Sequence, residues 1–121
     1  MKEIPNISGA ELEIMQVLWE ANKPLKIQEV CDGLKSSKWK YNTVGTLLMR
    51  MTEKGAVTSE KKERVNYFAP AINKEDYKKS QTKNLISKLY NGSVNDLAVS
   101  LFKSEDMSDG DIEEIRKMFD L

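Results

Sequence analysis

The stretch from Lys40 to Gly55 shows the clearest separation of apolar and polar positions in the chain. Its apolar residues recur at the i, i+3, i+4 and i+7 spacing that lines one face of an α-helix. The opposite face is mostly short and polar, and the DNA major groove is wide enough to admit such a helix, so we interpret the stretch as a recognition helix. The apolar face comprises Val44, Leu47, Leu48 and Met51; the other face comprises Asn42, Thr46, Met49 and Glu53, flanked by Thr43, Gly45 and Arg50.

Two amphipathic helices are predicted before this stretch. Ser8 and Glu11 form a capping-box pattern that starts the first helix. Pro24 ends it, because proline cannot supply an interior backbone N–H group and restricts the residue before it. The apolar positions of the second helix are Ile27, Val30, Cys31 and Leu34. A short helix, a polar turn and a helix with an exposed polar face form a helix-turn-helix pattern.

A β-hairpin is predicted after Gly55, which suits the positive φ that often follows a helix. Residues 56–59 and 65–69 are rich in β-branched and aromatic side chains, and the charged residues 60–64 separate them. The side chains expected to close the core beneath the hairpin are Val57, Val65 and Tyr67. Three helices followed by such a hairpin form a winged helix-turn-helix.

Three further helices are predicted between Asn73 and Leu121, with Asn73, Ser93 and Ser108 suited to cap their starts. They carry more apolar surface than so short a segment can bury, so we expect them to pair with a second copy. A helical lid folded back on the winged domain is the alternative. The residues predicted to form the dimer interface are Leu85, Leu89, Val94, Leu97, Ala98, Leu101, Phe102, Ile112, Ile115 and Phe119.

The predicted fold is therefore mainly α-helical with a small β-hairpin. We expect a winged helix-turn-helix DNA-binding domain over residues 1–72 and a helical dimerisation domain over residues 73–121. A two-fold dimer suits double-stranded operator DNA, because two recognition helices about one helical turn apart read a palindrome.

Charge is unevenly distributed, although nineteen basic and nineteen acidic residues cancel over the whole chain. Residues 35–64 have a net charge of +5 and residues 96–121 a net charge of −5. A basic patch at the recognition helix is what phosphate binding requires, although an ordinary mixed-charge surface can give the same count. The residues predicted to contact DNA are Lys40, Asn42, Thr43, Thr46, Arg50, Lys54, Lys61, Lys62 and Arg64.

Separate roles are expected within this set. Asn42, Thr43 and Thr46 are predicted to contact base edges, and Arg50 to contact phosphate or guanine. The lysines and Arg64 are predicted to hold the DNA backbone. Helix capping is the alternative role for Asn42 and Thr43, because both lie in the first turn.

Composition argues against enzymes and membrane proteins. The chain has no histidine and one cysteine, Cys31, which we interpret as a small apolar residue of the core. The acidic residues between Glu105 and Glu114 do not fit the EF-hand spacing, and no phosphate loop, catalytic triad or metal-ligand spacing occurs. We therefore expect no catalytic, metal or cofactor site.

No segment approaches the roughly 20 apolar residues of a membrane span, so we expect a cytoplasmic protein without membrane insertion.

Several motifs resemble the penicillinase and methicillin-resistance repressor family, together with the order of elements. One is Ile7-Ser8-x-Ala10-Glu11-x-Glu13-x-Met15-x-x-Leu18-Trp19. The others are Thr43-Val44-x-Thr46-Leu47-x-x-Arg50 with Lys54-Gly55-Ala56, and Tyr90-Asn91-Gly92-Ser93. The likeness covers nearly the whole chain. It implies a homodimeric winged-helix repressor that binds palindromic operators ahead of β-lactamase or resistance genes.

The resemblance also implies a mode of derepression, in which a membrane sensor detects β-lactam and the repressor is cut in the helix that starts at Ser93. The family is cut at an Asn-Phe pair, which aligns with Ser100-Leu101, and Leu101-Phe102 lies one position on. The asparagine is absent here. Copper-responsive repressors of the same fold carry a cysteine-rich tail, and this chain ends at Leu121 without one. The alternatives are a regulator that responds to another signal, such as a metal or small ligand, and a protein-interaction module without DNA binding.

Overall fold

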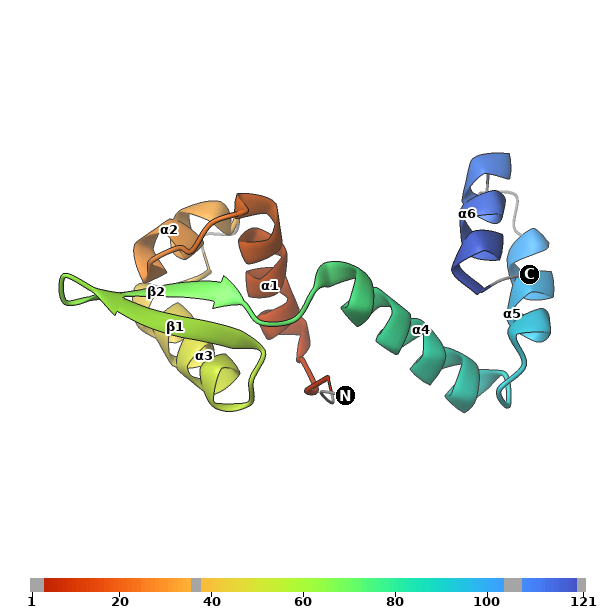
Figure 1. The fold of residues 1–121 in the computed structure, drawn as a ribbon, viewed down its shortest axis with the longest axis horizontal. Coiled ribbons are helices and arrows are strands. Elements are labelled where there is room, and N and C mark those ends of the chain that lie inside the picture. The colour runs from red at the N-terminus through yellow and green to blue at the C-terminus, as the bar shows by residue number, and fades with distance from the viewer. Residues whose placement is uncertain (1–3, 36–37, 104–107, 120–121) are drawn as a thin grey trace. The chain divides into compact units, whose positions relative to one another are not determined.

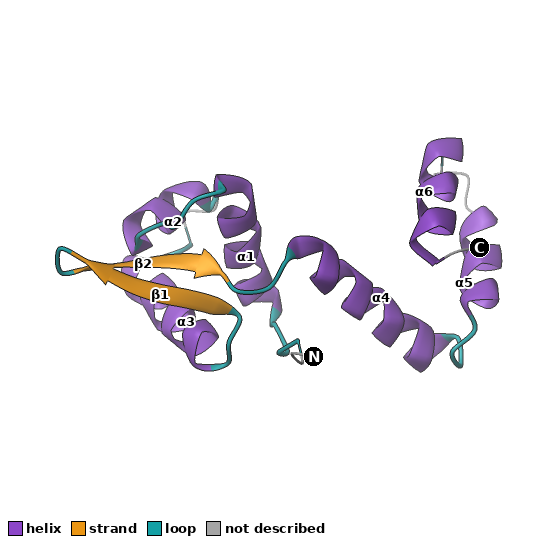
Figure 2. Cartoon of the chain, viewed as in Figure 1, coloured by secondary structure: helices purple, strands orange, loops and turns teal. Residues whose placement is uncertain are grey.

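The computed structural model describes residues 4–35, 38–103 and 108–119, and at positions 115, 116, 118 and 119 it describes the backbone alone. Helices dominate the described residues, with one antiparallel hairpin, β1-β2 (Figures 1 and 2). The chain forms two compact units, Met1–Tyr77 and Lys78–Leu121. The elements are α1 (Gly9–Ala21), α2 (Ile27–Gly33), α3 (Tyr41–Glu53), β1 (Val57–Lys62), β2 (Val65–Pro70), α4 (Lys74–Leu89), α5 (Val94–Phe102) and α6 (Asp109–Phe119).

The first unit begins with the predicted capping box. The Glu11 backbone N–H donates to Ser8 Oγ at 3.2 Å, and the Ser8 N–H donates to Glu11 Oε1 at 2.9 Å. Helix α2 packs closely on α1 at Gly33. A Cβ atom added at this glycine would lie only 2.6 Å from Val17 Cγ1. Glycine at position 33 therefore allows the approach of the two helices.

The hairpin differs from the expected one in length and turn. Its strands pair from Val57 with Pro70 to Lys62 with Val65, so Glu63 and Arg64 alone form the turn. Both have positive φ, 51° and 70°, as the type I′ turn of a two-residue hairpin requires. The prediction that residues 60–64 separate the strands was wrong, because residues 60–62 belong to β1 and pair with β2. Both faces of the hairpin are exposed there, so no alternation of apolar and polar residues marks this part of the strand in the sequence.

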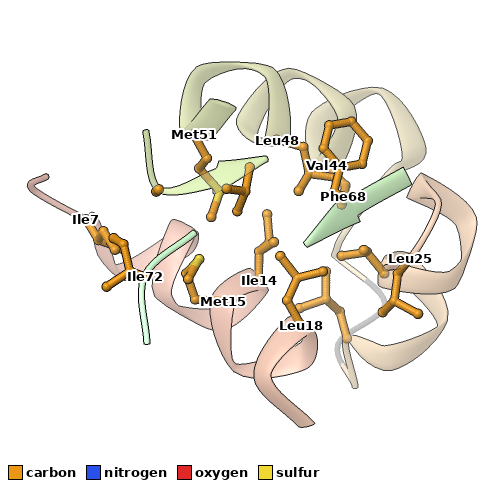
Figure 3. Close-up of a cluster of buried hydrophobic side chains, with 14 of the residues drawn as sticks. Ile7, Ile14, Met15, Leu18, Leu25, Val44, Leu48, Met51, Phe68 and Ile72 are labelled. Atoms are coloured by element: carbon orange, nitrogen blue, oxygen red, sulfur yellow. The ribbon is translucent and has the colours of Figure 1, made fainter. Parts of the chain in front are cut away.

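The core of the first unit is closed by Phe68 rather than by the predicted Val65 and Tyr67. Phe68 is completely buried, whereas Val65 is exposed and Tyr67 half-buried. Successive strand residues point to opposite faces, so an inward Phe68 places Val65 and Tyr67, three positions and one position before it, on the opposite face. Val57 is buried as predicted. Figure 3 shows Phe68 beside the α3 residues Val44 and Leu48.

A one-residue bridge adds a third segment to the hairpin. The Leu25 backbone N–H donates to the Phe68 carbonyl at 2.9 Å, and the Phe68 N–H donates to the Leu25 carbonyl at 2.7 Å. Leu25 is buried beside Leu18 in the same cluster (Figure 3). The residue that follows Pro24 therefore links the helix-turn-helix to the wing, and this confirms the winged-helix architecture.

Helix α4 starts in the first unit. Asn73 Oδ1 accepts hydrogen bonds from the N–H groups of Glu75 and Asp76 at 2.8 and 3.3 Å, which confirms the predicted cap. The Tyr77 ring packs on Trp19 at 5.8 Å between centroids, and the Trp19 indole N–H donates to the Ile72 carbonyl at 2.9 Å. The first unit thus includes the first turn of α4, and the proposed functional division at residue 72 stays a prediction.

The second unit comprises the rest of α4 with α5 and α6. Ser93 and Ser108 cap the last two helices, with their Oγ atoms each 3.1 Å from the N–H groups of Asp96 and Asp111. Ile86, Leu97 and Ala98 are its buried apolar residues among those described. None of the helices in the described part of the chain has the length and hydropathy needed to cross a membrane.

Candidate nucleic-acid interface

Helix α3 is held by one apolar face and exposes the other. Val44, Leu48 and Met51 are completely buried and point from α3 toward the α1 residue Ile14 (Figure 3). Leu47, the fourth residue of the predicted stripe, is half-buried and packs on the edge of the same cluster. The exposed residues of the helix beyond Tyr41 are Asn42, Thr43, Thr46, Met49, Arg50 and Glu53. Four of the predicted DNA contacts therefore lie on one accessible surface of α3.

The N-terminus of α3 offers unpaired donors to a ligand. Lys40 is the N-cap residue, its side chain makes no capping hydrogen bond, and the first turn contains no acidic residue. Among the described residues, neither the Asn42 amide nor the Thr43 hydroxyl has a hydrogen-bond partner. These two side chains thus do not cap the helix in this structure. Free N–H groups at a helix start, next to a lysine, favour binding of an anion such as phosphate.

Thr46 is exposed but its hydroxyl group is already used. Thr46 Oγ1 donates to the Asn42 backbone carbonyl one turn earlier, at 2.9 Å. The hydroxyl can still accept a hydrogen bond, and its methyl group is free to make an apolar contact.

The C-terminus of α3 is fixed by a Schellman motif and by an ion pair. The Gly55 N–H donates to the Thr52 carbonyl at 3.2 Å and the Ala56 N–H to the Met51 carbonyl at 2.8 Å, with Gly55 at φ 85°. Lys54 Nζ lies 2.7 Å from Glu11 Oε1 and donates to the Asn6 carbonyl at 2.8 Å. Two of the three Lys54 donors are therefore used within the domain, and the third remains available to another acceptor.

Glu11 is the one buried charged residue among those that the structure describes, with 4% of its surface exposed. Burial raises the pKa of its carboxyl group, but hydrogen bonds from Lys54 and Ser8 and the charge of Lys54 outweigh burial. The pKa of Glu11 therefore lies below its ordinary value, and the group is ionised at neutral pH. The ion pair joins the start of α1 to the end of α3 and so helps to set the orientation of α3.

The wing carries the remaining predicted contacts. Lys61 and Lys62 are the last two residues of β1, and Arg64 is in the turn that follows. All three are exposed, and the turn lies at the end of the hairpin that projects beyond α2 and α3 (Figure 1). Glu60 precedes these three residues and Glu63 lies between Lys62 and Arg64, so the tip has a mixed charge with a basic excess.

The residues predicted to form the dimer interface differ in their exposure in the single chain. Leu89 is 70% exposed, and Leu85 and Phe102 are also exposed. Leu97 and Ala98 are buried, whereas Val94, Leu101 and Ile112 are half-buried. The side chains of Ile115 and Phe119 lie outside the described residues. The exposed residues Leu85 and Leu89, one helical turn apart on α4, therefore form the start of an accessible apolar surface.

The predicted cleavage residues lie in and at the end of α5. Ser100 and Phe102 are exposed and Leu101 is half-buried. Tyr90 Oη and Ser100 Oγ are 3.5 Å apart, which connects the end of α4 to α5.

Two features of the site were missed by the sequence reasoning. The pairing of Glu11 with Lys54 could not be seen in the sequence. Glu11 was already explained as part of the capping box of α1, and Lys54 as a basic residue at the end of α3. Met49 was placed on the polar face by its spacing but was given no role, although it is half-exposed there.

Comparison with known proteins agrees with this geometry. The sequence profile of the family described as penicillinase repressor matches residues 7–120. The penicillinase repressor of Bacillus licheniformis is 33% identical over 121 residues, which cover 99% of this chain and 94% of that protein. The methicillin resistance regulatory protein MecI of Staphylococcus aureus strain N315 is 30% identical over 113 residues, covering 93% of this chain and 91% of that protein.

Two solved structures resemble the chain, both at 42% sequence identity and both covering 64% of this chain and 94% of the other. One is the solution structure of the DNA-binding domain of the repressor BlaI, with a TM-score of 0.54. The other is the monomeric form of Bacillus licheniformis BlaI in complex with the blaP half-operator, with a TM-score of 0.53. The winged helix and the match over nearly all of the sequence show that this chain belongs to the penicillinase repressor family of DNA-binding transcription regulators.

Proposed function

We propose that the chain is a homodimeric transcriptional repressor that inserts α3 into the major groove of a palindromic operator. The observation that carries the proposal is the exposed face of α3, where the Asn42 and Thr43 side chains have no partner among the described residues. Side chains of this kind form hydrogen bonds with base edges in the major groove. BlaI of Bacillus licheniformis, which shares the fold, has been seen in complex with a half-operator.

The cations around this face hold the phosphate backbone. Lys40 lies at the α3 N-terminus, where free backbone N–H groups add to its attraction for phosphate. Arg50 is exposed one turn beyond Thr46 and reaches phosphate or guanine. Lys61, Lys62 and Arg64 of the wing follow the backbone on one side, and Lys54 adds its remaining donor.

Dimerisation by the second unit sets the distance between two recognition helices. Among the residues predicted to form the interface, Leu85 and Leu89 on α4 and Phe102 on α5 are exposed in the single chain and gain most from burial against a second copy. Leu97 and Ala98 are buried already, so they support the interface from below by holding α5 in place. A two-fold pair places two half-sites about one helical turn of DNA apart.

The genes controlled are β-lactamase or other antibiotic-resistance genes, as the names of the relatives suggest. Derepression follows proteolysis in α5, at or next to Ser100, Leu101 and Phe102, in a pathway that begins at a membrane sensor. A cut there detaches α6 from the rest of the second unit and weakens the dimer. Proteases bind extended chain, so α5 must unwind locally before cleavage.

Gel mobility shift with a DNA duplex obtained by in vitro selection from a random library tests this function. The selected sequence should be palindromic, and the complex should contain two chains by sedimentation. Affinity should fall steeply with salt, since each phosphate contact releases a counterion. Failure to select any sequence, or binding without salt dependence, contradicts the proposal and favours a protein-interaction module.

A further inference from the structure

Met49 is an apolar residue on the surface that α3 presents to solvent. Half of its surface is exposed, although the helix buries Val44, Leu48 and Met51 completely. A structural role in the core therefore does not explain this residue. An exposed thioether gains free energy when a partner covers it and removes it from water.

The neighbour of Met49 across one turn of the helix is Thr46. Residues three apart on a helix have Cβ atoms about 5 to 6 Å from each other. The Thr46 hydroxyl hydrogen is used in the bond to the Asn42 carbonyl, which leaves the Thr46 methyl group as the apolar part of an exposed side chain. Thr46 and Met49 thus form a small apolar patch within a polar recognition surface.

The base edges of the major groove offer one apolar group to such a patch, the C5 methyl of thymine. We propose that Met49, with the Thr46 methyl, contacts a thymine methyl group in each half-site and so specifies thymine at that position. The inference rests on the proposed function, because it requires α3 to lie in the major groove. It assigns to α3 a contact that recognises an apolar group of the base rather than a hydrogen-bonding group.

Deoxyuridine provides the test, because it pairs as thymine does but lacks the C5 methyl group. The probe is the duplex selected by the wild-type chain, resynthesised with deoxyuridine in place of thymine at one symmetric pair of positions at a time. At one such position the wild-type chain should bind about fourfold more weakly per half-site, which is the effect of one buried methyl group. At the other positions the affinity should change little.

Met49→Ala and Met49→Gln should discriminate much less between the thymine and deoxyuridine duplexes, because both remove the Met49 part of the apolar contact and leave only the Thr46 methyl group. Met49→Leu should keep most of the discrimination. Val65→Ala is the matched control, since Val65 is an exposed apolar residue of the wing. The C5 methyl group of thymine lies in the major groove, where the proposal places α3 and not the wing. Loss of the Val65 side chain can therefore weaken binding without changing the deoxyuridine effect. Thermal unfolding should be nearly the same for all variants, because both positions are exposed.

The outcomes separate this inference from the proposed function. Equal affinity of the wild-type chain for every deoxyuridine duplex overturns the methyl contact and leaves operator binding intact. A deoxyuridine effect that is undiminished in Met49→Ala overturns the role of Met49. Absence of any selectable duplex overturns operator binding, and the inference with it.

Discussion

Lys54 Nζ lies 2.7 Å from Glu11 Oε1, and the two residues are 43 positions apart in the chain. The pair connects the first turn of α1 to the end of α3, and the Asn6 carbonyl accepts a second hydrogen bond from the same ammonium group. Because Glu11 also closes the capping box of α1, one carboxylate both starts a helix and positions another. The orientation of α3 is therefore coupled to the N-terminal segment.

The charge of Glu11 should stabilise the fold at neutral pH. Its folded-state pKa lies below the ordinary value, so this contribution is present above the ordinary pKa and is lost as pH falls through the lowered one. Glu11→Gln keeps the capping oxygen and should lower the free energy of unfolding by about 1 kcal/mol at pH 7. Urea denaturation should show that this difference shrinks as the pH falls through the lowered pKa of Glu11. Glu13→Gln, an exposed change on the same helix, is the control, and an equal effect at both positions contradicts the role of the pair.

The contact between α1 and α2 should not tolerate a side chain at position 33. A Cβ atom there would lie 2.6 Å from Val17 Cγ1, so Gly33→Ala should destabilise the fold by about 1 to 3 kcal/mol through overpacking. Gly9→Ala, at the start of α1, meets nothing within 4 Å and should be neutral or slightly stabilising. Thermal unfolding of both variants checks the contrast. A Gly33→Ala chain as stable as the wild type would show that the two helices separate easily.

The wing should contribute affinity without sequence preference. Lys61→Ala should weaken binding to selected and random duplexes alike and reduce the slope of log affinity against log salt by about 1. Lys79→Ala, an exposed lysine of α4, should leave this slope unchanged. If Lys61→Ala changes the preferred sequence and keeps the salt slope, the wing reads bases and the assigned role is incorrect.

The exposed apolar face of α4 should hold the dimer together. Leu89→Glu places a charge at a residue that is 70% exposed in the single chain, so it should convert the dimer to a folded monomer in sedimentation experiments. Asn84→Glu adds the same charge on another side of the helix and should leave the dimer intact. Equal association states of the two variants would place the interface elsewhere.

The sequence was most informative where a structural signal is local. The capping patterns at Ser8, Asn73, Ser93 and Ser108 located the starts of four helices, because each cap depends on residues within one turn. The apolar spacing of α3 likewise separated the buried Val44 from the exposed Asn42. These signals together were sufficient for the winged-helix fold.

Features that depend on distant residues or on an exposed strand were not predictable. The bridge between Leu25 and Phe68 is one residue long, so it has no periodicity to detect. The end of β1 could not be predicted, because residues 60–62 are charged and show no alternation of apolar and polar positions. A wing that is exposed on both faces does not need such an alternation. Choosing Tyr67 rather than Phe68 as a core residue was an error of one position in register, which reverses the face of every side chain.

The most direct test of base reading by α3 is to repeat the in vitro selection with the double variant Asn42→Ala and Thr46→Ala. The wild-type chain and Lys61→Ala should select the same palindrome, whereas the double variant should lose preference at the same positions of both half-sites, with discrimination there reduced by about 1 to 3 kcal/mol per base pair. Selection of an unchanged palindrome by the double variant would contradict the assignment of α3 as the element that reads the operator.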